Sequence, residues 1–286
     1  MRPAADLSER LRQWRADLTA WAIPLHITAA VSESPWVIPP QVFASRADRA
    51  GAAPSGPSYE RAWAALDPPG SVLDVGSGAG AASLALLPRT TSLEAVDTSA
   101  AMLTRLAERA ARAGVIARTV AGRWPDIASR TAPADVVTCH HVLYNVAEME
   151  PFVKALTSSA RRLVVVEVTA RHPLTPLNPL WLRFHGLRRP DSPTAADLVG
   201  VLQAMGLEPG HQEWRGQHGQ DYASLAELAD VTRRRLCLPP DRAAEVAEAL
   251  IQADADPENP ASSPGISGLP SPGRDLVTIW WQGRAG

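Results

Sequence analysis

Residues Val72-Leu73-Asp74-Val75-Gly76-Ser77-Gly78-Ala79-Gly80 join a short apolar run to a glycine-rich turn. The run at 72–75 has the length and composition of a buried strand. The three glycines after it allow the backbone to turn sharply and to approach a ligand with no side chain in between. The stretch therefore predicts a strand that ends in a ligand-binding turn.

The acids beside the turn indicate which ligand it binds. Because Ala81 follows, the glycines also satisfy the G-x-G-x-x-G/A fingerprint of dinucleotide-binding folds. Asp74 argues against a dinucleotide, since its carboxylate would face an anionic pyrophosphate. S-adenosylmethionine (SAM) has no phosphate and carries an ammonium and a sulfonium, so an acid at position 74 favours it. Asp97 comes 19 residues after Gly78, at the spacing of a carboxylate that binds ribose hydroxyls.

The pattern around the turn predicts the fold. From residue 71 onward, short apolar runs alternate with helical stretches, which is typical of a parallel sheet covered on both faces. We predict an α/β fold with a doubly wound, mostly parallel seven-stranded sheet and helices on both faces. The expected strands lie near residues 71–75, 92–96, 116–120, 134–139, 162–168, 207–214 and 276–281. The expected helices between them lie near residues 80–87, 99–113, 148–159 and 194–205.

The remaining segments are expected to extend this domain. Residues 1–57 read as an N-terminal arm, with a helix from about Leu7 to Trp21 and a proline-rich stretch after it. Residues 58–286 would form the main domain. Within it, residues 169–193, with five prolines, are expected to form a lid-like loop. Residues 216–274 are expected to form a helical insertion, with helices near 222–236 and 240–253 and a mobile Pro/Gly/Ser-rich loop at 257–273.

The motif Asp74-x-Gly76-x-Gly78-x-Gly80 followed by Asp97 resembles class I SAM-dependent methyltransferases, and the resemblance extends over roughly residues 58–214. It implies that the turn, including Ser77, holds the methionyl part and the sugar of SAM. It also implies that Asp97 accepts both ribose hydroxyls.

The same resemblance implies the residues around the adenine. Met102 would lie against the ring, and Gly122, Arg123 and Trp124 would line its edge. The family often has an acid that binds the adenine amino group, and Arg123 cannot accept that hydrogen bond. Asp126 or a backbone carbonyl would replace it. The cofactor set is expected to be completed by Thr98, Cys139 and His140.

The loop that follows the fourth expected strand, Cys139 to Val146, lies where ligands of open α/β sheets bind. In the family this loop passes the reactive methyl group. A hydroxyl acceptor would need a base, and His141 is the first candidate, with His172 and His140 as alternatives. Tyr144 and Asn145 would position the acceptor. A structural role for each histidine is the competing interpretation.

Composition narrows the class of protein. A net charge of -2 and a pI near 6.4 give no overall basic field for nucleic acid. The two cysteines have no zinc-site spacing, so we expect no metal and a reducing, cytoplasmic setting. No apolar run approaches the roughly 20 residues that span a bilayer. Five tryptophans would suit either an aromatic substrate cage or core packing and arm docking: Trp14, Trp21, Trp36, Trp181 and Trp214.

The sequence therefore predicts an enzyme that transfers a methyl group from SAM to an oxygen or nitrogen of a small-molecule acceptor. The sequence does not indicate the oligomeric state. RNA or protein methylation is the first alternative. A SAM-binding protein without catalysis is the second, and an NAD-dependent protein is the third.

Overall fold

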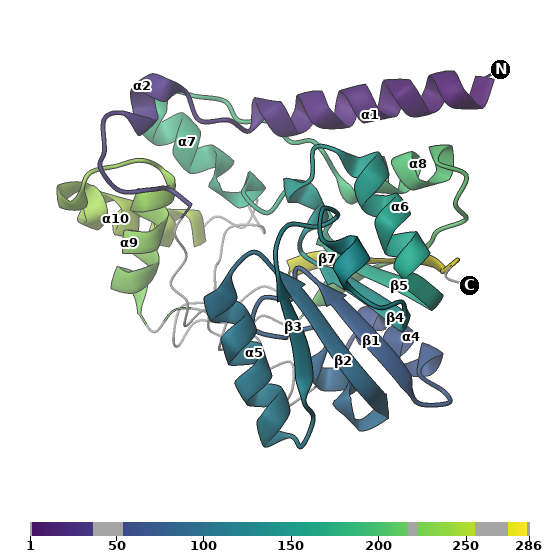
Figure 1. Cartoon of the computed structure of the whole chain (residues 1–286). Helices are drawn as coiled ribbons and strands as arrows, with labels where there is room; N and C mark the ends of the chain where they lie inside the picture. Colours follow the sequence, from purple (N-terminus) through teal and green to yellow (C-terminus); the bar gives the residue numbers. More distant parts are fainter. Residues whose placement is uncertain (1, 37–53, 217–221, 223, 255–273, 285–286) are drawn as a thin grey trace.

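The computed structural model describes residues 2–36, 54–216, 222, 224–254 and 274–284. Within them, seven strands form one sheet in the order β3-β2-β1-β4-β5-β7-β6 (Figure 1). Neighbours among β1 to β5 are parallel, and β7 runs antiparallel to both β5 and β6. The predicted fold class is confirmed. The strands are β1 Gly70–Val75, β2 Thr90–Asp97, β3 Ala117–Ala121, β4 Ala134–His140, β5 Ala160–Thr169, β6 Gly210–Gly216 and β7 Arg274–Gln282.

Two hydrophobic layers cover the sheet because its central strands are apolar on both faces. Val72 of β1 packs under α4 (Pro57–Ala65) and α5 (Ala100–Arg112). Leu73 and Val75 point the other way, toward α6 (Met149–Ser159) and α8 (Ala195–Ala204). This alternation follows the two-residue period of a strand. The long helix α1 (Arg2–Ala20) lies outside this second layer, against α8 (Figure 1).

The prediction of an α-helix at residues 80–87 is wrong. Gly80 has φ +95°, which no α-helix contains, and Pro88 lacks the N–H that a continuing helix needs. The chain instead turns and then forms the short 3₁₀ helix η1, Leu84–Arg89. The later helices of the main domain lie where expected, and side chains cap two of them at their starts. Ser99 caps α5, and Thr194 forms a capping box with Asp197 at α8.

Three segments that are far apart in sequence build a second hydrophobic core. α2 (Leu25–Thr28), α7 (Asn178–His185), α9 (Leu225–Arg235) and α10 (Ala243–Asp254) contribute its buried side chains, among them Ile27, Trp181, Leu228 and Leu250. Figure 1 shows these helices grouped at one end of α1, to the side of the sheet. We call this group the helical cover.

The segment expected to be a loop at residues 169–193 contains α7 and the 3₁₀ turn η4 (Thr175–Leu177). Proline is tolerated in the first turn of a helix, where its missing N–H has no partner, and Pro179 occupies that place in α7. The prolines therefore start the helix instead of preventing it. The expected mobile loop at 257–273 and the proline-rich stretch of the arm after Trp36 lie outside the described residues.

Two tryptophans attach α1 and its end to loops of the main domain. The indole N–H of Trp14 donates to the carbonyl oxygen of Val146 at 2.8 Å, and that of Trp21 donates to Ser192 O at 2.6 Å. Both indoles are buried, at 4% and 5% exposed. The arm therefore contacts the loop that leaves the carboxyl end of β4 and the loop between α7 and α8.

Candidate active site

The glycine turn is held at the end of β1 by backbone hydrogen bonds. The N–H groups of Gly76 and Ser77 donate to Val96 O of β2 at 2.8 and 3.0 Å. Gly76, Gly78 and Gly80 have φ values of +71°, +52° and +95°, which glycine adopts readily. A Cβ atom on Gly76 would lie 2.3 Å from Val142 Cγ2, whereas one on Gly78 would meet nothing within 4 Å. Gly76 therefore allows close packing, and Gly78 borders open space.

Asp97 ties this turn to the next helix. Its Oδ2 accepts from Gly78 N at 2.8 Å, and its Oδ1 accepts from Ser99 N at 2.8 Å. An ionised carboxylate offers roughly four acceptor positions, so about two remain after these bonds. The side chain is partly exposed at the carboxyl end of β2. This geometry leaves Asp97 fixed in place and able to accept the two hydroxyls of a ribose.

Asp74 has a different environment from the one that the sequence argument gave it. Its carboxylate is 1% exposed, and its two oxygens accept from Ser83 Oγ at 2.6 Å and Thr138 Oγ1 at 3.0 Å. Burial raises the pKa of Asp74 to about 6, against the lowering effect of both hydroxyls. The carboxylate thus fastens the turn to β4. Its contact with a cationic cofactor stays a prediction.

The expected adenine region is only partly assembled. Gly122 N donates to Asp97 O at 3.0 Å, which brings the segment after β3 beside Asp97. Met102 is half-buried in the first turn of α5. The indole of Trp124, however, is 5% exposed, and its N–H reaches Phe152 O at 3.4 Å, so Trp124 faces the core and not the edge of the site. The exposed residues of this region are Thr98, Arg123 and Asp126.

At the end of β4, three residues expected near the methyl group differ in environment. Cys139 is fully buried, and burial raises the pKa of its thiol, which therefore stays protonated. Burial also lowers the pKa of His140, beyond the raising effect of Glu167. His141 has φ +59°, which is rare for a residue with a side chain, and its N–H donates to Glu167 O at 2.7 Å. The strained backbone is an expected feature of a functional loop.

The sequence argument did not assign Glu167, which pairs with His141 at the end of β5. His141 Nε2 lies 3.2 Å from Glu167 Oε1. Burial alone would raise the pKa of Glu167, but the hydrogen bond from His141 and the charges of His140 and His141 lower it to about 2. An acid inside the apolar run of residues 163–168 was the signal in the sequence, because such a charge needs a partner.

The ring of Tyr144 lies between His172 and the His141–Glu167 pair. The ring of His172 stacks on Trp21 at 4.0 Å between centroids, and its Nδ1 accepts from Leu174 N at 3.3 Å. Burial, with a smaller effect of Arg189, lowers the pKa of His172 to about 4, so the ring is neutral at pH 7. Tyr144 bridges the two histidines, with centroids 5.9 Å from His172 and 6.4 Å from His141. Asn145 is exposed.

The site also has polar atoms that lack a partner among the described residues. Ser77 Oγ, His140 Nε2 and His141 Nδ1 are all buried without a hydrogen bond. An unsatisfied buried polar group costs about 1–3 kcal/mol, so such atoms mark places where a ligand's polar groups bind. Together with the open space at Gly78 and the free positions on Asp97, they fit SAM.

Two other classes of site were sought in the part of the chain that the structure describes. There, no group of His, Cys, Asp and Glu is arranged to hold a metal ion. None of the helices in these residues is both long and apolar enough to cross a membrane.

Comparisons with known proteins agree with this geometry. Residues 72–164 match the family described as "Methyltransferase domain". Among solved structures, the YcgJ protein from Bacillus subtilis superposes with a TM-score of 0.50 at 18% identity, covering 79% of this chain and 100% of that one. A cyclopropane-fatty-acyl-phospholipid synthase-like protein from Lactobacillus casei gives a TM-score of 0.54 at 14% identity, covering 90% and 97%. At these identities the likeness shows the fold alone.

No curated protein sequence matches the chain. The matched segment runs from β1 to the middle of β5 and includes the glycine turn and Asp97. The sheet order and the matched segment together identify the chain as a class I SAM-dependent methyltransferase.

Proposed function

We propose that this enzyme transfers the methyl group to an oxygen or nitrogen of a small-molecule acceptor, and that a hydroxyl oxygen is the best supported of these. The pairing of His141 with Glu167, at 3.2 Å, carries the proposal. A sulfonium methyl group is already activated, so a base is needed only when the acceptor has a proton to lose. A partly exposed imidazole paired with a more deeply placed carboxylate beside the cofactor turn is suited to that task.

Glu167 and His141 have different roles in the proposed reaction. Glu167 is ionised, with a pKa of about 2, and accepts a hydrogen bond from the N–H at His141 Nε2. This fixes the tautomer of the ring and leaves Nδ1, which has no partner among the described residues, as the acceptor. An acceptor hydroxyl would donate to Nδ1, and its proton would end on the imidazole as the new O–CH₃ bond forms. The carboxylate would then stabilise the imidazolium.

When bound, SAM supplies a methyl group on a sulfonium that leaves as a neutral thioether. The chain's own contribution is to align the acceptor with that group. Asp97, held by Gly78 and Ser99, would fix the ribose. His172, which the sequence offered as a second base, is neutral and stacked on Trp21, and it is better placed to form a wall for the acceptor.

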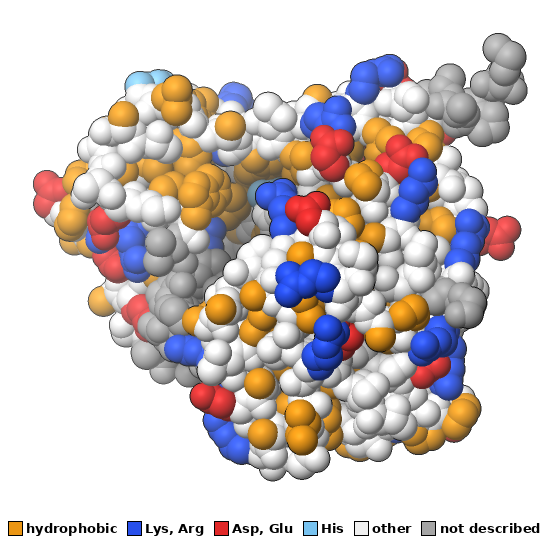
Figure 2. All heavy atoms as spheres, in the orientation of Figure 1, with side chains coloured by type: hydrophobic (Ala, Val, Ile, Leu, Met, Phe, Trp, Pro, Cys, Tyr) orange, Lys and Arg blue, Asp and Glu red, His pale blue; other side chains and the backbone are white. Residues whose placement is uncertain are grey.

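A small acceptor is favoured over RNA by the charge distribution. The face in Figure 2 shows basic and acidic side chains interspersed, with no broad basic area. An RNA-modifying enzyme is expected to present a contiguous positive surface. The net charge of -2 points the same way.

We also propose that the arm and the helical cover exclude water from the reaction. Arg189, which follows α7, donates to the carbonyl oxygens of Trp21 and Ala22 at the end of α1, the second at 2.9 Å. The cover is thus joined to the arm, next to the loop that contains His172. A closed, water-free site strengthens the electrostatic contacts of a transition state.

The test is methyl transfer by the full chain from labelled SAM, with small hydroxyl compounds, amines, RNA and protein as parallel acceptors. His141→Gln should lower turnover by roughly 10²–10⁴-fold, the usual contribution of a general base, while SAM affinity is unchanged. His211→Gln is the matched control, since His211 is exposed on β6. Turnover of His141→Gln equal to that of the control would rule out the base, and transfer only to RNA or protein would rule out the acceptor class.

A further inference from the structure

We propose that Ser58 and Thr278 are positioning residues: they hold the carboxylate of Glu167 in the orientation in which it fixes the ring of His141. The inference rests on the proposed function, because it names residues that act through the same histidine–carboxylate pair. Ser58 is the second residue of α4, and Thr278 lies on β7. Both side chains are buried, at 2% and 0% exposed.

The sheet and α4 bring the two hydroxyls to Glu167. In the antiparallel pair of β5 and β7, Thr278 is directly opposite Glu167, so the two side chains stand on the same face of the sheet. α4 covers this face and contacts both strands. Ser58 Oγ lies 2.6 Å from Thr278 Oγ1 and also forms a hydrogen bond with Glu167. The start of a helix carries a partial positive charge, which favours the ionised form of a carboxylate beside it.

The two ends of this hydrogen-bonded chain fix the direction of every bond in it. The indole N–H of Trp214 can only donate, and it donates to Thr278 Oγ1 at 3.0 Å. The ionised carboxylate of Glu167 can only accept, so Ser58 donates its one hydroxyl proton to it. The remaining bond, between the two hydroxyls, then runs from Thr278 to Ser58. The chain thus leads from β6 through β7 and α4 to Glu167, which also accepts from His141 Nε2.

Such a chain holds the carboxylate and does not carry a proton away from it. The indole nitrogen of Trp214 cannot accept a proton, so a proton that reaches His141 stays on the imidazole–carboxylate pair. Aligned hydrogen bonds polarise one another, and the two hydroxyls therefore oppose rotation of the Glu167 carboxylate. A fixed carboxylate gives His141 one neutral tautomer, with the proton on Nε2 and the lone pair on Nδ1. Without the hydroxyls both tautomers should form, and a ring with its proton on Nδ1 cannot accept there.

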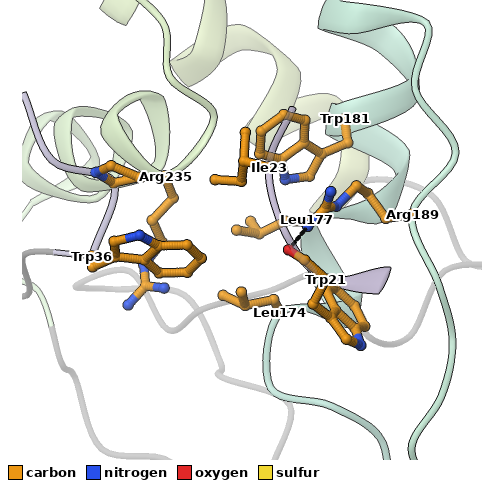
Figure 3. A pocket seen from close by; sticks show the side chains of 9 residues that line it. Trp21, Ile23, Trp36, Leu174, Leu177, Trp181, Arg189 and Arg235 are labelled. Carbon is orange, nitrogen blue, oxygen red and sulfur yellow. Dashed lines mark hydrogen bonds between the residues drawn. The ribbon is translucent and has the colours of Figure 1, made fainter. Parts of the chain in front are cut away.

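The second histidine of the site has no such support. His172 stacks on Trp21, whose carbonyl oxygen accepts from Arg189 (Figure 3). Burial and the charge of Arg189 lower the pKa of His172 to about 4, and in the described part of the chain no carboxylate opposes them. The hydrogen-bonded chain therefore selects His141 as the histidine that receives a proton.

Nitrogen-15 NMR of the full chain, labelled at its histidine rings and saturated with S-adenosylhomocysteine, tests the inference without an acceptor. Loss of a signal in His141→Gln assigns the ring. We expect neutral His141 of the wild type to carry its proton on Nε2 alone. Ser58→Ala and Thr278→Val should each give a mixture of the two neutral tautomers, whereas Thr278→Ser, which keeps the hydroxyl, should keep the Nε2 form. Ser71→Ala is the matched control, because it removes a serine hydroxyl that donates to another carboxylate, Asp135, at 2.9 Å near the amino ends of β1 and β4.

Methyl transfer gives a second measurement. Ser58→Ala and Thr278→Val should each lower turnover roughly tenfold, the usual effect of one hydrogen bond to a charged group, and leave SAM affinity unchanged. Thr278→Ser should restore turnover. A residue that acts through Glu167 has no effect once that carboxylate is lost, so Ser58→Ala should not lower the turnover of Glu167→Gln any further.

Three results would overturn the inference: a single Nε2 tautomer in both hydroxyl variants, turnover of these variants equal to that of Ser71→Ala, or an equal loss from Ser58→Ala with and without Glu167. Failure of the proposed function looks different. If the tautomers mix as expected but His141→Gln transfers methyl groups as fast as the wild type, the positioning of the ring stands and the proposed base does not. If His141→Gln is slow and the tautomer ignores both hydroxyls, the proposed function stands and this inference fails.

Discussion

Replacing Asp74 by asparagine changes stability in a way that the structure predicts quantitatively. The pKa of Asp74 rises from 3.8 to about 6 on folding, so the folded state binds more protons than the unfolded state between these values. Its ionisation therefore destabilises the fold as pH rises through this window. From the two pKa values, the cost is about 2 kcal/mol at pH 5 and about 3 kcal/mol at pH 8.

Asparagine has nearly the same shape and no charge. Its amide can accept from one of the two hydroxyls and donate to the other, since the hydroxyls of Ser83 and Thr138 serve in both roles. The free energy of unfolding of Asp74→Asn, relative to the wild type, should therefore increase by about 1 kcal/mol between pH 5 and pH 8.

Urea unfolding followed by tryptophan fluorescence at several pH values in this range measures the difference. Asp135→Asn is the control, because hydrogen bonds from Ser71 and the charges of Arg162 and Arg161 outweigh burial and lower the pKa of Asp135. It titrates below pH 3.8, so its difference from the wild type should stay flat. If the free energy of unfolding of Asp74→Asn, relative to the wild type, stays constant or falls as pH rises, the account of Asp74 is refuted. A large loss of SAM affinity would place its carboxylate at the cofactor instead.

Three further predictions concern the turn, the arm and the histidine pair. Gly76→Ala should destabilise the fold by more than about 1 kcal/mol, because its Cβ would meet Val142 at 2.3 Å. Gly78→Ala should act mainly on SAM binding, because a Cβ there meets nothing within 4 Å. Equal effects of the two variants on unfolding and on calorimetric affinity for SAM would contradict this. Trp14→Phe removes the bond to Val146 O and should cost roughly 1–3 kcal/mol in thermal or urea unfolding; no change would show that this contact does not hold the arm. Glu167→Gln should lower turnover without lowering SAM affinity, and unchanged turnover in the labelled-methyl assay would remove it from the mechanism.

The sheet could be predicted because its strands are buried on both faces. Such strands appear as continuous apolar runs, and the turn residues between them mark their ends. Caps such as Ser99 and Thr194 mark helix starts for the same local reason. The helix expected after β1 does not form because Gly80 adopts a positive φ and Pro88 lacks a backbone N–H, and the apolar spacing shows neither effect.

The parts of the site that were missed depend on contacts between distant segments. Glu167 becomes a partner of His141 only because β4 and β5 are neighbours in register, with His140 opposite Glu167. Asp74 finds Thr138 through the pairing of β1 with β4. Neither contact can be read from spacing along the chain.

The second hydrophobic core shows the same limit on a larger scale. The arm, the segment around α7 and the insertion with α9 and α10 each look like separate extensions in the sequence. Ile27, Trp181 and Leu250 nevertheless share one cluster. Amphipathic patterns show that a face is buried, but not which distant segment covers it.

The most direct test of the central claim is a calorimetric titration of the full chain with SAM, S-adenosylhomocysteine and NAD. The account predicts tight binding of SAM and S-adenosylhomocysteine, no measurable binding of NAD, and a loss of a few kcal/mol in SAM affinity for Asp97→Ala, as charge-assisted hydrogen bonds to the ribose disappear. Tight binding of NAD without binding of SAM would contradict it.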